Sequence, residues 1–82
     1  MLRKDLTCGP DRNVFLLRMD AGARGRKHTH AHVEHCYVIE GDVSIVGLQL
    51  GAGDHHIAGK GTVHDGLTTD RGCLLLLAES LV

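Results

Sequence analysis

The chain has 82 residues, of which 43% are hydrophobic and 23% charged, so we expect one globular domain rather than a disordered chain. A net charge of −1 and only two aromatic residues argue against nucleic-acid binding, which relies on a basic surface or on stacking rings. The three cysteines, Cys8, Cys36 and Cys73, lie far apart and form no CxxC pair, which argues against a disulfide framework and a zinc knuckle.

The sequence predicts neither a signal peptide nor a membrane span. The first residues, MLRKDLTCGPDR, lack the apolar stretch of a signal peptide. The longest apolar run, CLLLLA at 73–78, is too short to span a bilayer. We therefore expect a cytoplasmic protein with no membrane partner. A core this small is marginal, so a second copy or a bound metal would add stability.

Six short apolar segments follow a first dozen residues that we expect to form an edge strand or an arm. Gly, Asp or Asn bounds most of the segments, as is typical of strands separated by turns, and no long amphipathic helical pattern appears. Short strands at this spacing predict an all-β sandwich or barrel. The segments are 13–19, 36–40, 42–46, 48–50, 55–58 and 73–78.

Two of these segments carry further expectations. Gly47 permits a tight turn between 42–46 and 48–50, with Val43 and Ile45 on one face of the first strand. The run at 73–78 does not alternate, which predicts a strand covered on both faces. In so small a chain a second copy would supply the second cover, so we expect a homodimer through this strand or the N-terminal arm.

All seven histidines lie between positions 28 and 64, and four of them fall with Glu34 in the stretch HTHAHVEH at 28–35. Imidazole and carboxylate are ligands for zinc, iron, manganese and nickel. Side chains at i and i+2 of a strand share a face, so His28 and His30 can reach one ion. Glu34 has the same parity, but so has His32, and alternation alone leaves both open as the third ligand.

The spacing of glycines and ligands around this cluster resembles the first motif of the cupin superfamily. The matching residues are Gly22, His28, His30, Glu34 and Gly41. A second cupin motif follows in register, with glycine in place of the usual proline at 59 and threonine where an asparagine often stands at 68. Its matching residues are Gly53, Asp54, Gly59, Gly61 and His64. The pieces GDHHIAGKGTVH and GCLLLL are most similar to the cupin-like domain of ChrR-type anti-sigma factors.

The resemblance implies a small double-stranded β-helix, the jelly-roll barrel of cupins, in one domain over 1–82 with its motifs at 22–41 and 53–68. It also implies one divalent metal inside the barrel, zinc being the first expectation. The implied ligands are His28, His30, Glu34 and His64. In the family a Pro-Gly turn often precedes the glutamate; Ala31-His32 stands here instead, which leaves His32 as an extra or competing ligand.

Strand parity sorts the remaining candidates. His56 shares a face with Ala58 that turns inward in cupins, so we expect it to orient a metal ligand, with a fifth ligand or an acid–base residue as the alternative. Cys36 shares parity with Glu34 and is expected to be a buried, inert thiol. Three residues are expected on the opposite, outer face: His35, Tyr37 and His55.

Three functions are compatible with these residues. The first is a metal-dependent binding or sensing module of ChrR-like type, in which the ion stabilises the barrel and exposes a surface to a partner or a small-molecule ligand. The alternative is a metal-dependent enzyme, dioxygenase-like with iron or an isomerase or hydrolase with zinc or manganese, because such ligand sets leave coordination positions open. A barrel with incidental histidines would make two in-register motifs an accident. We therefore predict a small metal-binding cupin.

Overall fold

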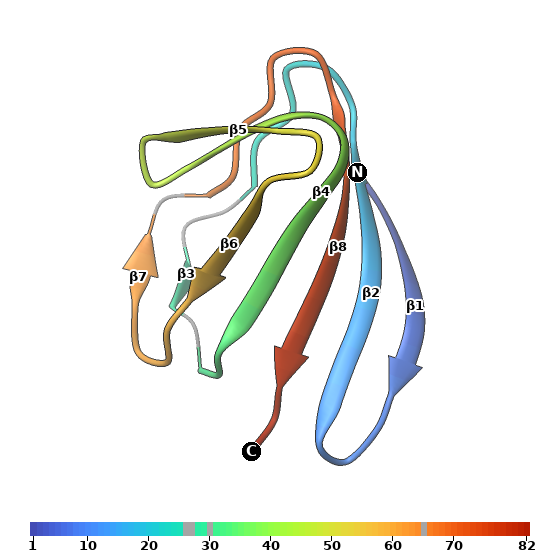
Figure 1. Ribbon diagram of the computed structural model, residues 1–82, viewed down its shortest axis with the longest axis vertical. Helices are drawn as coiled ribbons and strands as arrows, with labels where there is room; N and C mark the ends of the chain where they lie inside the picture. Colours follow the sequence, from blue (N-terminus) through green and yellow to red (C-terminus); the bar gives the residue numbers. More distant parts are fainter. Residues whose placement is uncertain (26–27, 30, 65) are drawn as a thin grey trace.

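The computed structural model describes residues 1–25, 28–29, 31–64 and 66–82, and gives the backbone alone at 28–29 and 63–64. The described residues form strands, turns and loops but no helix, as the spacing of the short apolar segments predicted (Figure 1). The strands are β1 (Leu2–Cys8), β2 (Arg12–Met19), β3 (His28–Thr29), β4 (Glu34–Ile45), β5 (Leu48–Gly51), β6 (His55–Ala58), β7 (Val63–His64) and β8 (Cys73–Ser80). None of the described residues belongs to a helix that could cross a membrane.

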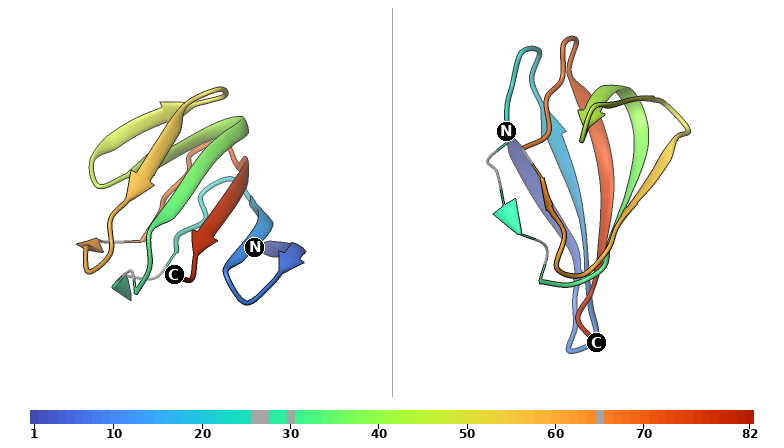
Figure 2. Two further views of the ribbon diagram at one scale, coloured as in Figure 1. Left: turned by 60° about the horizontal axis from the view of Figure 1, so that its bottom comes forward. Right: turned by 90° about the vertical axis from the view of Figure 1, so that its left-hand side faces the viewer.

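Six of these strands form one antiparallel sheet in the order β1-β2-β8-β4-β5, with β6 also paired to β4. β3 and β7 form a separate two-stranded ladder. In Figure 1 this ladder lies on the left, whereas β1 and β2 lie on the right. Figure 2 shows the long strands curving together into the wall of an open barrel, so the expected jelly-roll architecture is confirmed.

β4 bends the sheet because it changes partners along its length. Its first half pairs with β6 and β8, and its second half pairs with β5. We expected separate strands at 36–40 and 42–46, but Gly41 joins them with a φ of 86°, a conformation that other residues rarely adopt. A Cβ atom at this position would overlap the carbonyl oxygen of Gly72 and lie 2.7 Å from the Cα of Cys73. Glycine therefore lets one continuous strand turn against β8.

The core fills the concave side of the sheet. Residues directly opposite one another in antiparallel strands share a face, and the register stacks Phe15 on Leu77 and Met19 on Cys73 between β2 and β8. The same rows continue into β4, whose inward side chains are buried. Val43 and Ile45 are buried together, as their parity predicted. The buried cluster is Phe15, Met19, Cys36, Val38, Val43, Ile45, Cys73, Leu75 and Leu77.

The outer face of the sheet is also apolar, although the chain leaves it partly exposed. In β8, Cys73, Leu75 and Leu77 are buried, whereas Leu74, Leu76 and Ala78 alternate with them and are only half-buried. The chain therefore covers the inner face of β8, whereas the outer face, which we also expected to be covered, is left half-exposed. Leu16, Leu76 and Tyr37 form one register row on this face, and Leu74 and Ile57 lie in adjacent rows. We define the outer apolar patch by these five residues.

β1 is the edge strand expected for the first dozen residues. All of its seven residues are exposed, and it pairs only with β2 among the described strands. A β-bulge between Asp5 and Thr7 shifts its register, which is common at sheet edges. The side chains before the bulge lie opposite inward residues of β2, Asp5 facing Phe15 and Arg3 facing Leu17. The edge strand thus extends the concave face beyond the core.

Candidate metal centre

The two sequence motifs meet in the ladder of β3 and β7. His28 of the first motif and His64 of the second are register partners in this antiparallel pair. Their side chains, and the whole of His30, lie outside the described residues. The ladder therefore brings together the backbone positions of two expected ligands that are far apart in the sequence.

Glu34 begins β4 and lies on the inner face of the sheet. Its register partners are Ala58, which is buried, and Glu79. The Glu34 side chain is partly buried and lines a cavity of about 240 Å³ at the concave side. The other lining residues are mostly apolar and come from the N-terminal residue, β2, β8 and the loops before β3 and β8: Met1, Phe15, Leu17, Met19, Gly25, Leu67 and Leu77.

His56 turns inward, as its parity with Ala58 predicted. It lies directly opposite Cys36 and is half-buried, whereas its neighbours His55 and Ile57 are exposed. His56 and Glu34 line the same small gap in the core, together with Cys36 and Ala58. Because it lies beside the candidate ligand Glu34, His56 could orient that ligand, act as a fifth ligand or act as an acid–base residue.

His32 is half-buried in the loop between β3 and β4, where the usual Pro-Gly turn is replaced. No group of three or more potential metal-binding side chains is complete within the described part of the chain, which omits the side chains of His28, His30 and His64. The full ligand set of His28, His30, Glu34 and His64, and the competing role of His32, therefore remain predictions.

Cys36 is the inert thiol that the sequence predicted. It is 4% exposed, and burial raises its pKa to about 12, with the charge of Glu34 and the neighbouring Cys73 adding to the shift. Burial also raises the pKa of Cys73, although a hydrogen bond from Thr69 opposes the shift. A thiol that stays protonated is a poor nucleophile and a poor ligand. All three cysteines are free.

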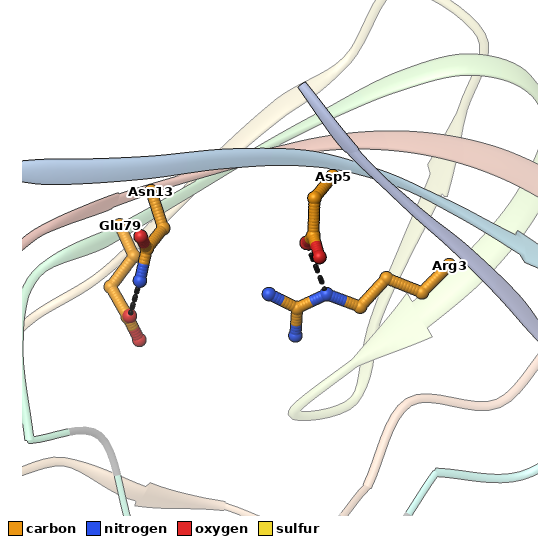
Figure 3. A network of polar contacts seen from close by, with 4 residues as sticks. All are labelled: Arg3, Asp5, Asn13 and Glu79. Carbon is orange, nitrogen blue, oxygen red and sulfur yellow. Dashed lines mark hydrogen bonds and ion pairs between the residues drawn. The ribbon is translucent and has the colours of Figure 1, made fainter. Parts of the chain in front are cut away.

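The concave face also carries polar residues that sequence reasoning missed. Four side chains project from one side of the sheet in Figure 3: Arg3, Asp5, Asn13 and Glu79. Arg3 Nε donates to Asp5 Oδ1 at 2.8 Å, and its guanidinium carbon lies 3.7 Å from the centre of the Phe15 ring. Asn13 Nδ2 donates to Glu79 Oε1 at 3.3 Å. Alternation along β8 through Cys73, Leu75 and Leu77 could have predicted that Glu79 points inward. The predicted strand ended at Ala78, so Glu79 was left out.

The donor types in this region fit a divalent transition-metal ion. Imidazole nitrogen and carboxylate oxygen are the ligands that zinc and iron accept in proteins. Glu34 supplies a carboxylate on the inner wall, and the β3–β7 ladder supplies adjacent histidine positions. A metal bound by such residues would act as a Lewis acid on a ligand that reached it.

Comparison with known families agrees with this architecture. The family model described as the ChrR Cupin-like domain matches residues 3–82. The chain belongs to the ChrR cupin-like family. No curated protein sequence matches it significantly.

Solved cupin structures superimpose closely on this cupin. An RmlC-like cupin from Shewanella frigidimarina NCIMB 400 has a TM-score of 0.85 and 28% identity over 98% of this chain and 75% of its own. KdgF from Halomonas sp. has a TM-score of 0.81 and 29% identity over 95% of this chain and 76% of its own. A structure of Rhodobacter sphaeroides SigE in complex with the anti-sigma ChrR has a TM-score of 0.84 and 26% identity over 94% of this chain. This cupin spans only 43% of the matched chain of that complex.

Proposed function

We propose that this cupin is a metal-dependent binding or sensing module whose single divalent ion is held by His28, His30, Glu34 and His64. The observation that carries the proposal is the register pairing of His28 with His64, because it unites the two motifs at one place. Glu34 supports it, since a partly buried carboxylate on the inner wall gains from a cationic partner. Zinc is the ion that we favour, because imidazole and carboxylate suit it and it needs no redox partner.

The cavity beside Glu34 suits a small molecule. Its volume of about 240 Å³ lies below the range of drug-sized pockets, and most of its lining residues are apolar. We propose that a small, largely apolar ligand occupies it and approaches the ion from the side of β2 and β8. Three free thiols agree with a cytoplasmic, reducing location.

The same cavity favours a second candidate function, a metal-dependent enzyme of the dioxygenase type. An iron ion with open coordination positions beside an apolar cavity could bind a small substrate together with dioxygen. His56 would then be the acid–base residue, because it lines the gap next to Glu34. Iron in the isolated protein, rather than zinc, would support this second function.

We also propose that two copies associate through the outer apolar patch. Tyr37 and Ile57, diagonal neighbours on this face, are 42% and 54% exposed, and an exposed apolar patch marks an interaction surface. Arg18 and Glu40 on this face lie 3.2 Å apart and form an ion pair, and Lys4 lies at the edge of the patch, opposite Leu16. A neutral apolar patch is self-complementary, as a two-fold interface requires.

Elemental analysis of the protein purified without an affinity tag tests the metal centre. We expect about one zinc ion per chain. About one iron ion per chain would favour the dioxygenase-type function instead. If the protein contained no metal and took up none on addition, the proposed centre would be wrong and the family would describe the fold alone.

A further inference from the structure

Two histidines outside the proposed centre lie against each other on the outer face. His35 of β4 and His55 of β6 are both exposed, and their nitrogens Nδ1 and Nε2 are 3.0 Å apart. The β4–β6 register makes them diagonal neighbours, since His35 faces Ile57 and His55 faces Tyr37. Diagonal pairs on one face of a sheet are within reach of long side chains.

The geometry of the two rings suits a shared ligand. Their planes are within 15° of each other and their centroids are 5.2 Å apart. The distance between the centroids is nearly the sum of the nitrogen–nitrogen distance and the two ring radii. The two rings therefore lie edge to edge, with the two nitrogens facing each other. In the metal-free chain one ring nitrogen donates a hydrogen bond to the other, and this hydrogen bond keeps the two nitrogens close together.

The nitrogen separation is also what one transition-metal ion demands. Two imidazole nitrogens bound to one ion at about 2.0–2.1 Å lie roughly 2.9–3.4 Å apart, for angles between square and tetrahedral. The observed 3.0 Å falls in this range. An ion would sit beside the line between the nitrogens, so each ring must turn by roughly 40° to aim its nitrogen at the ion, which its exposed position permits.

The geometry points to a second transition-metal site on the outer face, formed by His35 and His55. Its class of ligand is a divalent ion that favours imidazole, such as Zn²⁺, Ni²⁺ or Cu²⁺. His35 and His55 lie opposite Ile57 and Tyr37 of the outer apolar patch, so water, or a residue of a second copy in the proposed dimer, would fill the other coordination positions. With two ligands from one chain, this site is weaker than a site with four protein ligands. It does not depend on the proposed inner centre, because these side chains lie on the opposite face of the sheet from Glu34.

Calorimetric titration with Zn²⁺ tests the site, in a Cys8→Ser background because Cys8 is a free, exposed thiol and thiolates bind zinc. We expect a tight and a weak class of ions, each with one ion per chain. His35→Ala and His55→Ala should each remove the weak class. Leu48→Ala is the control, since Leu48 is exposed on β5 outside the outer apolar patch and carries no ligand atom, and it should retain both classes. Retention of the weak class in both histidine variants would overturn the site.

A double variant separates this inference from the proposed function. His30→Ala with His64→Ala should lose the tight class and keep the weak one. A native chain with the weak class alone would overturn the inner centre and support the outer site. If the double variant does not fold, the histidine ring resonances of the unmodified chain replace it. The second equivalent of Zn²⁺ should then shift the His35 and His55 resonances together, and unshifted resonances at saturation would overturn the site.

Discussion

At the scale of single residues, the turn between β4 and β5 contains a side chain that does not suit its backbone. Val46 has a φ of 51° and Gly47 a φ of 77°, and the pair forms a two-residue hairpin turn in which both positions are left-handed. Asparagine tolerates this conformation, whereas a β-branched residue is strained in it. The sequence predicted the turn from Gly47, but not that valine would share its conformation.

We expect Val46→Asn to stabilise the protein by about 1 kcal/mol, because it relieves this strain. Val46 is 59% exposed, so little packing is lost. Thermal unfolding should show a melting temperature higher by roughly 4–8 °C. Val46→Ala serves as the control, since it removes the branch but keeps an unfavourable left-handed residue, and should gain less. If the asparagine variant were no more stable than the native chain, then Val46 would not be strained in its left-handed conformation.

Asp42 is a second residue whose chemistry can be tested, through pH. The backbone amides of Asp70 and Arg71 donate to its carboxylate at 3.0 and 2.9 Å. These hydrogen bonds hold the pKa of Asp42 below its ordinary value. A carboxyl group whose pKa is lower in the folded state stabilises the fold above its unfolded pKa of about 3.9, and this contribution is lost as the pH falls through the folded value.

Asp42→Asn should therefore lower the free energy of unfolding at neutral pH, and the difference from the native chain should shrink as the pH falls below about 4. Urea denaturation across this range measures the effect. Asp70→Asn is the control, because it removes a charge from the same loop without removing the carboxylate that binds the two amides. A constant difference between the Asp42 variant and the native chain at every pH would refute the role of the charge.

At the scale of elements, the continuity of β4 depends on Gly41. Its φ of 86° and its contact with the backbone of Gly72 and Cys73 leave no space for a side chain. Gly41→Ala should destabilise the protein by about 3 kcal/mol or more, because backbone atoms must move. Gly51→Ala is a matched control on the neighbouring strand, where an added Cβ meets nothing within 4 Å. Urea denaturation should find the Gly51 variant near the native value, and an equal loss in both variants would contradict the role of Gly41.

The strands illustrate what local pattern can and cannot predict. Alternation placed Cys36, His56 and Ala58 on the inner face and His35, Tyr37 and His55 on the outer face, because side-chain direction in a strand is a local property. The contact of His35 with His55 depends on the register of β4 with β6, which no local pattern encodes. The position of Glu79 beside Glu34 likewise depends on the pairing of β8 with β4, although alternation along a longer β8 would have indicated its inner face.

At the scale of the whole molecule, a bound ion should contribute directly to the stability of so small a barrel. If the ion binds only the folded chain, then removing a ligand lowers metal content and melting temperature together. We expect both losses in His64→Ala, and we expect a chelator to lower the melting temperature of the native chain towards that of the variant. His32→Ala distinguishes the competing ligand, because it should retain the metal. If the His64 variant kept its metal, then His64 would not be a ligand of the centre.

The outer apolar patch concerns the assembly of whole molecules. Burial of Tyr37, Ile57 and their neighbours against a second copy would add apolar area that the small core cannot supply. A lysine in this patch would place an unpaired charge in the interface, so we expect Ile57→Lys to be monomeric at micromolar concentrations, where the native chain is a dimer. Leu48→Lys is a closely matched control, because Leu48 and Ile57 are both 54% exposed but Leu48 lies on β5, outside the patch. Light scattering gives the mass of each. A monomeric native chain would contradict the proposed dimer, and a dimeric Ile57 variant would place the interface elsewhere on the molecule.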